Sequence, residues 1–139
     1  MTTKQWLSRA WCIEEEINDL MERRVREREK LTSITQKLAG DAVQSTYDPH
    51  KFDRLVQLNG EIDKQLDRLY QVKAEVTAAI GRLDKGVYRR ILENRYIDRM
   101  SFEAIACKIH YSYKQTCRLH GRALIEMGEI IAGLRTEKQ

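Results

Sequence analysis

The fold of this chain is decided by residues 101–124, which read SFEAIACKIHYSYKQTCRLHGRAL. Ser101 is a suitable N-cap for a first short helix. Four apolar residues then recur at i, i+3, i+4 and i+7, the spacing of one buried helix face: Phe102, Ile105, Ala106 and Ile109. His110 and Tyr111 break this spacing, and Ser112 can cap a second helix. The stretch therefore predicts two helices joined by a tight turn.

The predicted second helix has two contrasting faces. Its buried face follows helical spacing through Thr116, Leu119 and Ala123. The opposite face is basic and aromatic, and it holds Tyr113, Lys114, Cys117 and Arg118. A helix with such an outer face is suited to the major groove of double-stranded DNA.

The composition favours long, exposed helices, because 33% of the 139 residues are charged and proline occurs once. Basic and acidic residues balance over residues 1–86, with 15 of each, whereas residues 87–139 hold 10 basic and 6 acidic residues. The excess positive charge thus lies with the predicted helix pair, as expected of a nucleic-acid binder.

The N-terminal half predicts two long helices. From Thr3 to Leu38 and from His50 to Leu83, apolar residues follow alternating steps of three and four, and residues 40–49 have the composition of a loop. We expect an antiparallel helical hairpin over residues 1–84 that binds a partner or forms a homodimer. Each stripe has a polar interruption, and pairing the stripes sets Arg24 opposite Gln65.

A third, short helix is predicted from Val87 to Ile97, and it begins a second domain over residues 87–139. The expected fold class is therefore all-α, with the hairpin followed by a C-terminal helix-turn-helix domain. No stretch approaches the roughly 18 consecutive apolar residues of a membrane helix, and the N-terminus lacks the apolar core of a secretory signal. We expect a cytoplasmic protein with reduced cysteines and no membrane partner.

Four segments carry a resemblance to known proteins: residues 91–96 (ILENRY), 101–106 (SFEAIA), 111–112 (YS) and 118–124 (RLHGRAL). Together they resemble region 4 of bacterial sigma factors. They are still more similar to the ArpU-type and related sigma-like late-gene regulators of phages and prophages. The resemblance covers roughly residues 87–126, and it implies sequence-specific DNA binding in transcription control, in the cytoplasm of a bacterial host cell.

The resemblance also implies roles for single positions. Ser112 matches the residue that opens the recognition helix, and Tyr113, Lys114 and Arg118 match positions that face bases. Two positions depart from the family pattern, because His110 stands where the turn usually has glycine and Thr116 where the helix has a buried aliphatic residue.

The outward face and its charge extend these assignments. We predict DNA base contacts from Tyr113, Lys114, Gln115, Cys117 and Arg118. We predict phosphate contacts from Arg95, Arg99, Lys108, Ser112 and Arg122.

Other kinds of site have weaker support in the sequence. Cys107, His110, Cys117 and His120 form two Cys-x2-His pairs, but only six residues separate the pairs, so we expect no metal and no cofactor. No phosphate-cradling glycine loop or nucleophile motif is present, and we expect no enzyme. Two alternatives stay open, namely a small-terminase-like DNA-packaging protein and a sigma-like adaptor that binds RNA polymerase.

Overall fold

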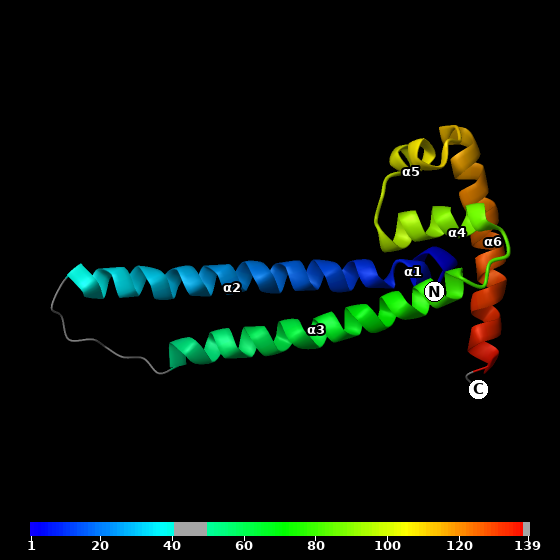
Figure 1. The fold of residues 1–139 in the computed structure, drawn as a ribbon. Helices are drawn as coiled ribbons and strands as arrows, with labels where there is room; N and C mark the ends of the chain where they lie inside the picture. The colour runs from blue at the N-terminus through cyan, green and yellow to red at the C-terminus, as the bar shows by residue number, and fades with distance from the viewer. Residues whose placement is uncertain (41–49, 138–139) are drawn as a thin grey trace. The chain divides into compact units, whose positions relative to one another are not determined.

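The computed structural model describes residues 1–40 and 50–137, with the side chains of residues 33–40 and 51 left aside. Every regular element in these ranges is a helix (Figure 1). The helices are α1 (Thr3–Leu7), α2 (Arg9–Gly40), α3 (His50–Ile80), α4 (Gly86–Leu92), the π-helical η1 (Glu93–Ile97), α5 (Phe102–Ile109) and α6 (Tyr113–Glu137). The predicted all-α class is confirmed. The loop was predicted over residues 40–49, but Gly40 is the last residue of α2, and residues 41–49 lie outside the described residues.

The first helix is shorter than its sequence pattern predicts. Thr2 and Gln5 form a capping box at its start, as each side chain accepts a hydrogen bond from the backbone N–H of the other. The helix then ends at Ser8, whose hydroxyl donates to the carbonyl of Lys4 at 2.7 Å. Serine competes for helix backbone in this way, and the predicted single helix from Thr3 to Leu38 is divided into α1 and α2.

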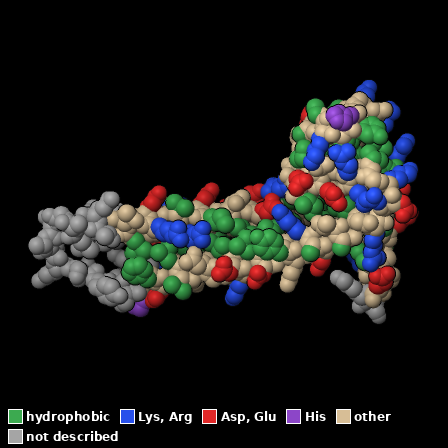
Figure 2. Space-filling model, in the orientation of Figure 1, with side chains coloured by type: hydrophobic (Ala, Val, Ile, Leu, Met, Phe, Trp, Pro, Cys, Tyr) green, Lys and Arg blue, Asp and Glu red, His purple; other side chains and the backbone are tan. Residues whose placement is uncertain are grey.

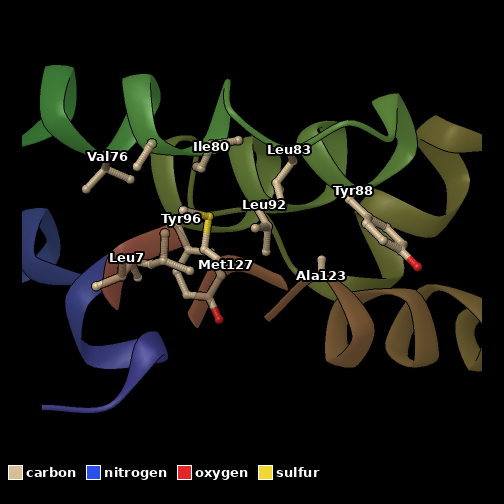
Figure 3. Close-up of a cluster of buried hydrophobic side chains, with 11 residues drawn as sticks. Leu7, Val76, Ile80, Leu83, Tyr88, Leu92, Tyr96, Ala123 and Met127 are labelled. Atoms are coloured by element: carbon tan, nitrogen blue, oxygen red, sulfur yellow. The ribbon is translucent and has the colours of Figure 1, made fainter. Parts of the chain in front are cut away.

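The described chain forms two compact units whose boundary differs from the predicted one near residue 85. The first unit contains Met1–Trp11 and Tyr70–Gln139, and the second contains Cys12–Leu69. Residues 1–11 and 70–83 belong with the C-terminal helices because their apolar side chains share one core with them. That core joins segments far apart in the sequence (Figure 3).

The core of the first unit is built by α1, the end of α3, α4, η1 and α6. Its central side chains are almost fully buried, and Figure 3 shows them pointing toward one another. They are Leu7, Val76, Ile80, Leu83, Tyr88, Leu92, Tyr96, Ala123 and Met127. A smaller cluster of Ile91, Ile105 and Ile109 fixes α5 beside α4. The N-terminal half of α6 is thus held by buried contacts with several elements.

The predicted helix over residues 87–97 contains a π-helical end. The backbone N–H of Asp98 donates to the carbonyl of Glu93 at 3.1 Å, five residues back rather than four. The wider turn leaves both Asn94 and Tyr96 buried. Beyond it, Arg99 has a φ of 57°, and the N–H of Met100 donates to the carbonyl of Asn94 at 2.9 Å. This turn directs the chain into α5.

The second unit consists of parts of α2 and α3, which run side by side in opposite directions (Figure 1). Its buried hydrophobic residues are Ile13, Ile17, Leu20, Ile62 and Leu69.

The predicted pairing of Arg24 with Gln65 does not form as a hydrogen bond, since Nε of Arg24 and Oε1 of Gln65 are both buried without a hydrogen-bond partner among the described residues. Nη1 of Arg24 donates instead to Oδ1 of Asn59 at 3.3 Å, while Gln65 lies near Leu20 and Arg23.

Candidate nucleic-acid interface

The first helix of the candidate site, α5, forms as its sequence pattern predicts. The hydroxyl of Ser101 accepts a hydrogen bond from the N–H of Ala104 at 3.2 Å, which confirms Ser101 as the N-cap. Ile105, Ala106 and Ile109 are buried, and Phe102 is half-buried. The helix is therefore packed along the predicted face.

The turn after α5 places His110 in the left-handed region, with φ 62° and ψ 38°. This is the position that the family resemblance assigns to glycine, which adopts such angles without steric cost. The N–H of Tyr111 donates to the carbonyl of Ala106 at 3.1 Å and closes the turn. His110 takes the required conformation, and its side chain is exposed.

The start of α6 is fixed by a second capping box. The hydroxyl of Ser112 accepts from the N–H of Gln115 at 3.1 Å, and Oε1 of Gln115 accepts from the N–H of Ser112 at 3.3 Å. Both residues belong to the predicted DNA contacts, and in the free protein their side chains bond to the turn. Their first role is therefore to set the direction of α6.

Thr116 fills its core position despite its hydroxyl. The residue is fully buried, and the hydroxyl donates to the carbonyl of Ser112 at 2.9 Å. A threonine can bond to the preceding helical turn in this way. This departure from the family pattern therefore leaves no unsatisfied group, because the polar atom is bonded and the side chain is enclosed.

The outer face of α6 presents most of the predicted base-contacting side chains to solvent. Tyr113, Lys114, Gln115 and Arg118 are exposed, and Cys117 is half-buried. Lys114, Arg118 and Arg122 are spaced by four residues, so they form one basic stripe along the helix. Figure 2 shows lysine and arginine side chains on the surface of this unit.

Tyr113 stands beside the basic stripe as a neutral hydroxyl. A hydrogen bond with the Cys117 side chain raises the pKa of Tyr113, and electrostatic interactions with Cys117 and Glu103 act in the same direction. The phenol therefore stays protonated at neutral pH and can both donate and accept a hydrogen bond.

Besides Ser112, three of the predicted phosphate-contacting residues have partners within the protein. The guanidinium of Arg99 lies 5.2 Å from the ring centre of Trp11, and the other two are Lys108 and Arg95. Nζ of Lys108 donates to Oδ1 of the buried Asn94 at 2.8 Å. Nη1 of Arg95 donates to the carbonyl of Met100 at 3.0 Å, and its guanidinium lies 4.5 Å from the ring centre of Phe102. Both residues stabilise the segment between η1 and α5. Arg122 lies exposed on α6.

A buried aromatic cluster that the sequence does not predict supports this interface. Its central contact is a hydrogen bond of 2.8 Å between the hydroxyl of Tyr96 and Nε2 of His120. Nε1 of Trp11 donates to the carbonyl of Tyr96 at 2.9 Å, and the ring of Phe102 meets His120 edge-on at 4.8 Å between ring centres. The cluster holds α6 against η1, α5 and the N-terminal segment. In the sequence, His120 stands out in the His-Gly-Arg-Ala-Leu run and in a Cys-x2-His pair, and neither pattern predicts its burial.

The environment of His120 keeps its ring neutral. Burial lowers the pKa of His120 to about 4, and the positive charges of Lys4 and Arg95 contribute in the same direction. Burial also raises the pKa of Tyr96, although Arg95 opposes this shift. The pair therefore consists of two uncharged groups at neutral pH, as a packed aromatic cluster requires.

The two Cys-x2-His pairs are not assembled into a metal site. Cys107 and His110 are exposed, whereas His120 is buried with Tyr96. Across residues 1–40 and 50–137, wherever side chains are described, no group of three or more potential metal ligands is found.

No helix in the described part of the chain has an apolar stretch long enough to cross a lipid bilayer. Comparison of the chain with protein-family models, with curated proteins and with solved structures gives no match.

The candidate interface offers cationic and hydroxyl donors on one helix. Groups of these kinds can bind phosphates and the edges of bases.

Proposed function

We propose that this chain is a sequence-specific DNA-binding transcriptional regulator that reads promoter or operator DNA with the first turns of α6. The observation that carries the proposal is the division of this helix into two faces. Thr116, His120 and Ala123 are buried, while Lys114, Arg118 and Arg122 form an exposed basic stripe. Such a helix can enter the major groove, roughly 12 Å wide, without exposing its core.

The proposed complex is a helix-turn-helix in which α5 lies across the DNA backbone and α6 follows the groove. Arg118 and Lys114 would make the principal base contacts, since both can bond to guanine O6 and N7. Arg122 would contact phosphate. Tyr113 would add a hydroxyl and an aromatic ring at the end of the helix that enters first.

The side chains of Ser112 and Gln115 are bonded to each other's backbone in the capping box, which limits the DNA contacts that they can make. A capped N-terminus still offers backbone N–H groups to a phosphate oxygen. We assign the start of α6 at Ser112 to phosphate binding, and we assign a base contact to Gln115 only if its side chain leaves the cap in the complex.

The resemblance to sigma factor region 4 and to sigma-like late-gene regulators supports transcription control in a phage or prophage. In that setting, the second unit, Cys12–Leu69, which is the outer part of the helical hairpin predicted over residues 1–84, would bind a second protein molecule or RNA polymerase. The predicted helix-turn-helix domain over residues 87–139 would bind the DNA.

The test is selection of DNA fragments by the purified protein, followed by titration of the selected fragment and of a scrambled fragment. Arg118→Ala should reduce the preference for the selected fragment by about 10-fold or more, because one bidentate base contact is lost. Its affinity for the scrambled fragment should change much less.

Arg135→Ala is the matched control, since Arg135 is an exposed arginine in the last turn of the same helix. This variant should keep the full preference. Failure of the wild-type protein to prefer any fragment would overturn the proposal. Co-purification of RNA polymerase in that case would favour the adaptor alternative.

A further inference from the structure

The first unit contains a hollow of about 240 Å³ where α1, the start of α2, the end of α3 and the last turns of α6 meet. All the residues that line it belong to this one compact unit. They come from the N-terminus, the end of α3 and the end of α6, which lie far apart in the sequence. On α6 the hollow lies at the opposite end from the residues that we assign to DNA.

The inner lining of this hollow is apolar. Ala79 and Ile131 are almost fully buried, and Trp6 and Leu134 are half-buried. We call these four residues the apolar floor. Ala79 and the neighbouring, exposed Ala78 leave space that longer side chains would fill. An apolar group placed there would remove its own surface and that of the floor from water, which favours binding.

The outer lining is charged and mainly basic. It holds three arginines and one glutamate, namely Arg9, Arg82, Arg135 and Glu75. Nη2 of Arg9 lies 3.0 Å from Oε2 of Glu75, so these two charges are paired. Arg82 has a looser partner, because its Nη2 lies 3.8 Å from Oε2 of Glu137 and both side chains are more than half exposed. Arg135 is exposed, and the described residues include no ion pair of its side chain. The outer lining therefore has an excess of positive charge.

We propose that this hollow binds a small carboxylate with an apolar body, and that Arg135 and Arg82 hold its charged group. The apolar body lies on the apolar floor. A guanidinium group can donate two parallel hydrogen bonds to a carboxylate, which suits arginine to this ligand. A cationic ligand would be repelled by the excess positive charge, and an uncharged ligand would leave that charge unpaired.

The volume of the hollow sets the size of the ligand. It equals the share of roughly eight water molecules in the liquid, at about 30 Å³ each. Bonded atoms pack more closely than water molecules do, so the ligand has on the order of ten non-hydrogen atoms. Sites for drug-sized ligands are larger, at about 300–1,000 Å³.

The same size argues against a protein helix as the occupant. A helix that lies in a groove uses anchors from position i to i+7, which are spread over roughly 10 Å along its axis. A hollow of this volume has room for one such side chain. A protein partner would therefore need contacts outside the hollow, whereas a small carboxylate needs only the residues that line it.

The test is equilibrium dialysis of the purified protein against octanoate, a straight-chain carboxylate of the expected size. One octanoate should bind per chain. Octylamine has the same apolar chain with a positively charged group, and it should bind more weakly by about 10-fold or more, because it meets the arginines with a like charge.

Two variants locate the site. Arg135→Glu should weaken octanoate binding by about 10-fold or more, because a charged hydrogen-bond donor is replaced by a group with the charge of the ligand. Ala78→Trp should weaken it to a similar extent, because the new ring fills the hollow from an exposed position. Circular dichroism establishes that both variants keep their helix content.

Each variant has a matched control in the same unit. Arg90→Glu reverses the charge of an exposed arginine on α4, and Ala74→Trp places the same ring one turn earlier on α3. Neither residue lines the hollow, so both controls should bind octanoate as the wild type does.

Three outcomes would overturn the proposal. They are no binding of octanoate to the wild type, equal binding of octylamine, and octanoate binding that either Arg135→Glu or Ala78→Trp leaves unchanged. The measurement uses no DNA, so this inference and the proposed function can fail separately.

Discussion

The hydroxyl of Tyr96 lies 2.8 Å from Nε2 of His120, and this hydrogen bond joins the π-helical segment to the middle of α6. Both residues are almost fully buried. The bond therefore connects the end of the α4–η1 segment with the helix that carries the proposed DNA contacts. Its loss would loosen the support of that helix.

The first prediction concerns pH. The pKa of His120 is lowered to about 4 in the folded chain, from 6.5 for an unperturbed histidine. The unfolded chain therefore takes up this proton first as the pH falls. The free energy of unfolding should decrease between about pH 6.5 and pH 4, by on the order of 2 kcal/mol once solvent screening is allowed for.

Denaturant titrations at a series of pH values check this expectation. His120→Gln should remove that part of the pH dependence, because glutamine does not titrate. His110→Gln is the control, since it removes an exposed imidazole that lies outside the buried aromatic cluster. A pH profile that stays the same in His120→Gln would assign the effect to other groups.

The second prediction concerns the left-handed turn. His110→Gly should raise the free energy of unfolding by about 1 kcal/mol, because glycine adopts a φ of 62° without a clash of its side chain. His110→Ala should give no such gain, since alanine keeps the Cβ atom. Equal stability changes in the two variants would show that the backbone angle is not the cause.

The third prediction concerns Gln65 in the second unit. Its Oε1 atom is buried without a hydrogen-bond partner among the described residues. Gln65→Leu should therefore stabilise the protein by about 1 kcal/mol, because it removes an unsatisfied polar group. Thermal unfolding at one fixed protein concentration measures the change. The exposed Gln57→Leu should have little effect, and a loss of stability in Gln65→Leu would contradict the interpretation.

The fourth prediction concerns the salt dependence of DNA binding, and it rests on the proposed function. If Arg122 contacts phosphate, Arg122→Ala should reduce the slope of log K against log salt concentration by about 0.9. It should weaken binding to the selected and scrambled fragments alike. Fluorescence anisotropy at several salt concentrations provides the slope. An unchanged slope would remove Arg122 from the phosphate-contacting set.

Some features of the fold were predictable from the sequence because their causes are local. Ser101 and Ser112 cap helices because each precedes a run with helical spacing, and the hydroxyl reaches a backbone N–H three residues on. The buried positions Ile105, Ile109 and Ala123 follow the helical period. The same pattern predicted which side chains of α6 face solvent, including Lys114 and Arg118.

Other features were not predictable because the residue pattern allows more than one outcome at these positions. Ser8 ends α1 although the apolar spacing continues past it, and the π-helical turn at Glu93 has no signature in the residue pattern. Arg24 contacts Asn59 rather than Gln65, since heptad spacing allows several registers and packing selects among them.

The stretch from Ser101 to Leu124 by itself determined two helices, their caps, and the basic outer face of the second. Short-range hydrogen bonds and helical spacing suffice for these features. Only the tertiary structure decided what supports that face. Leu7 and Val76 enter the same core as Met127, and Tyr96 bonds to His120. These partners are brought together by burial of apolar surface over long sequence separations, which no local pattern specifies.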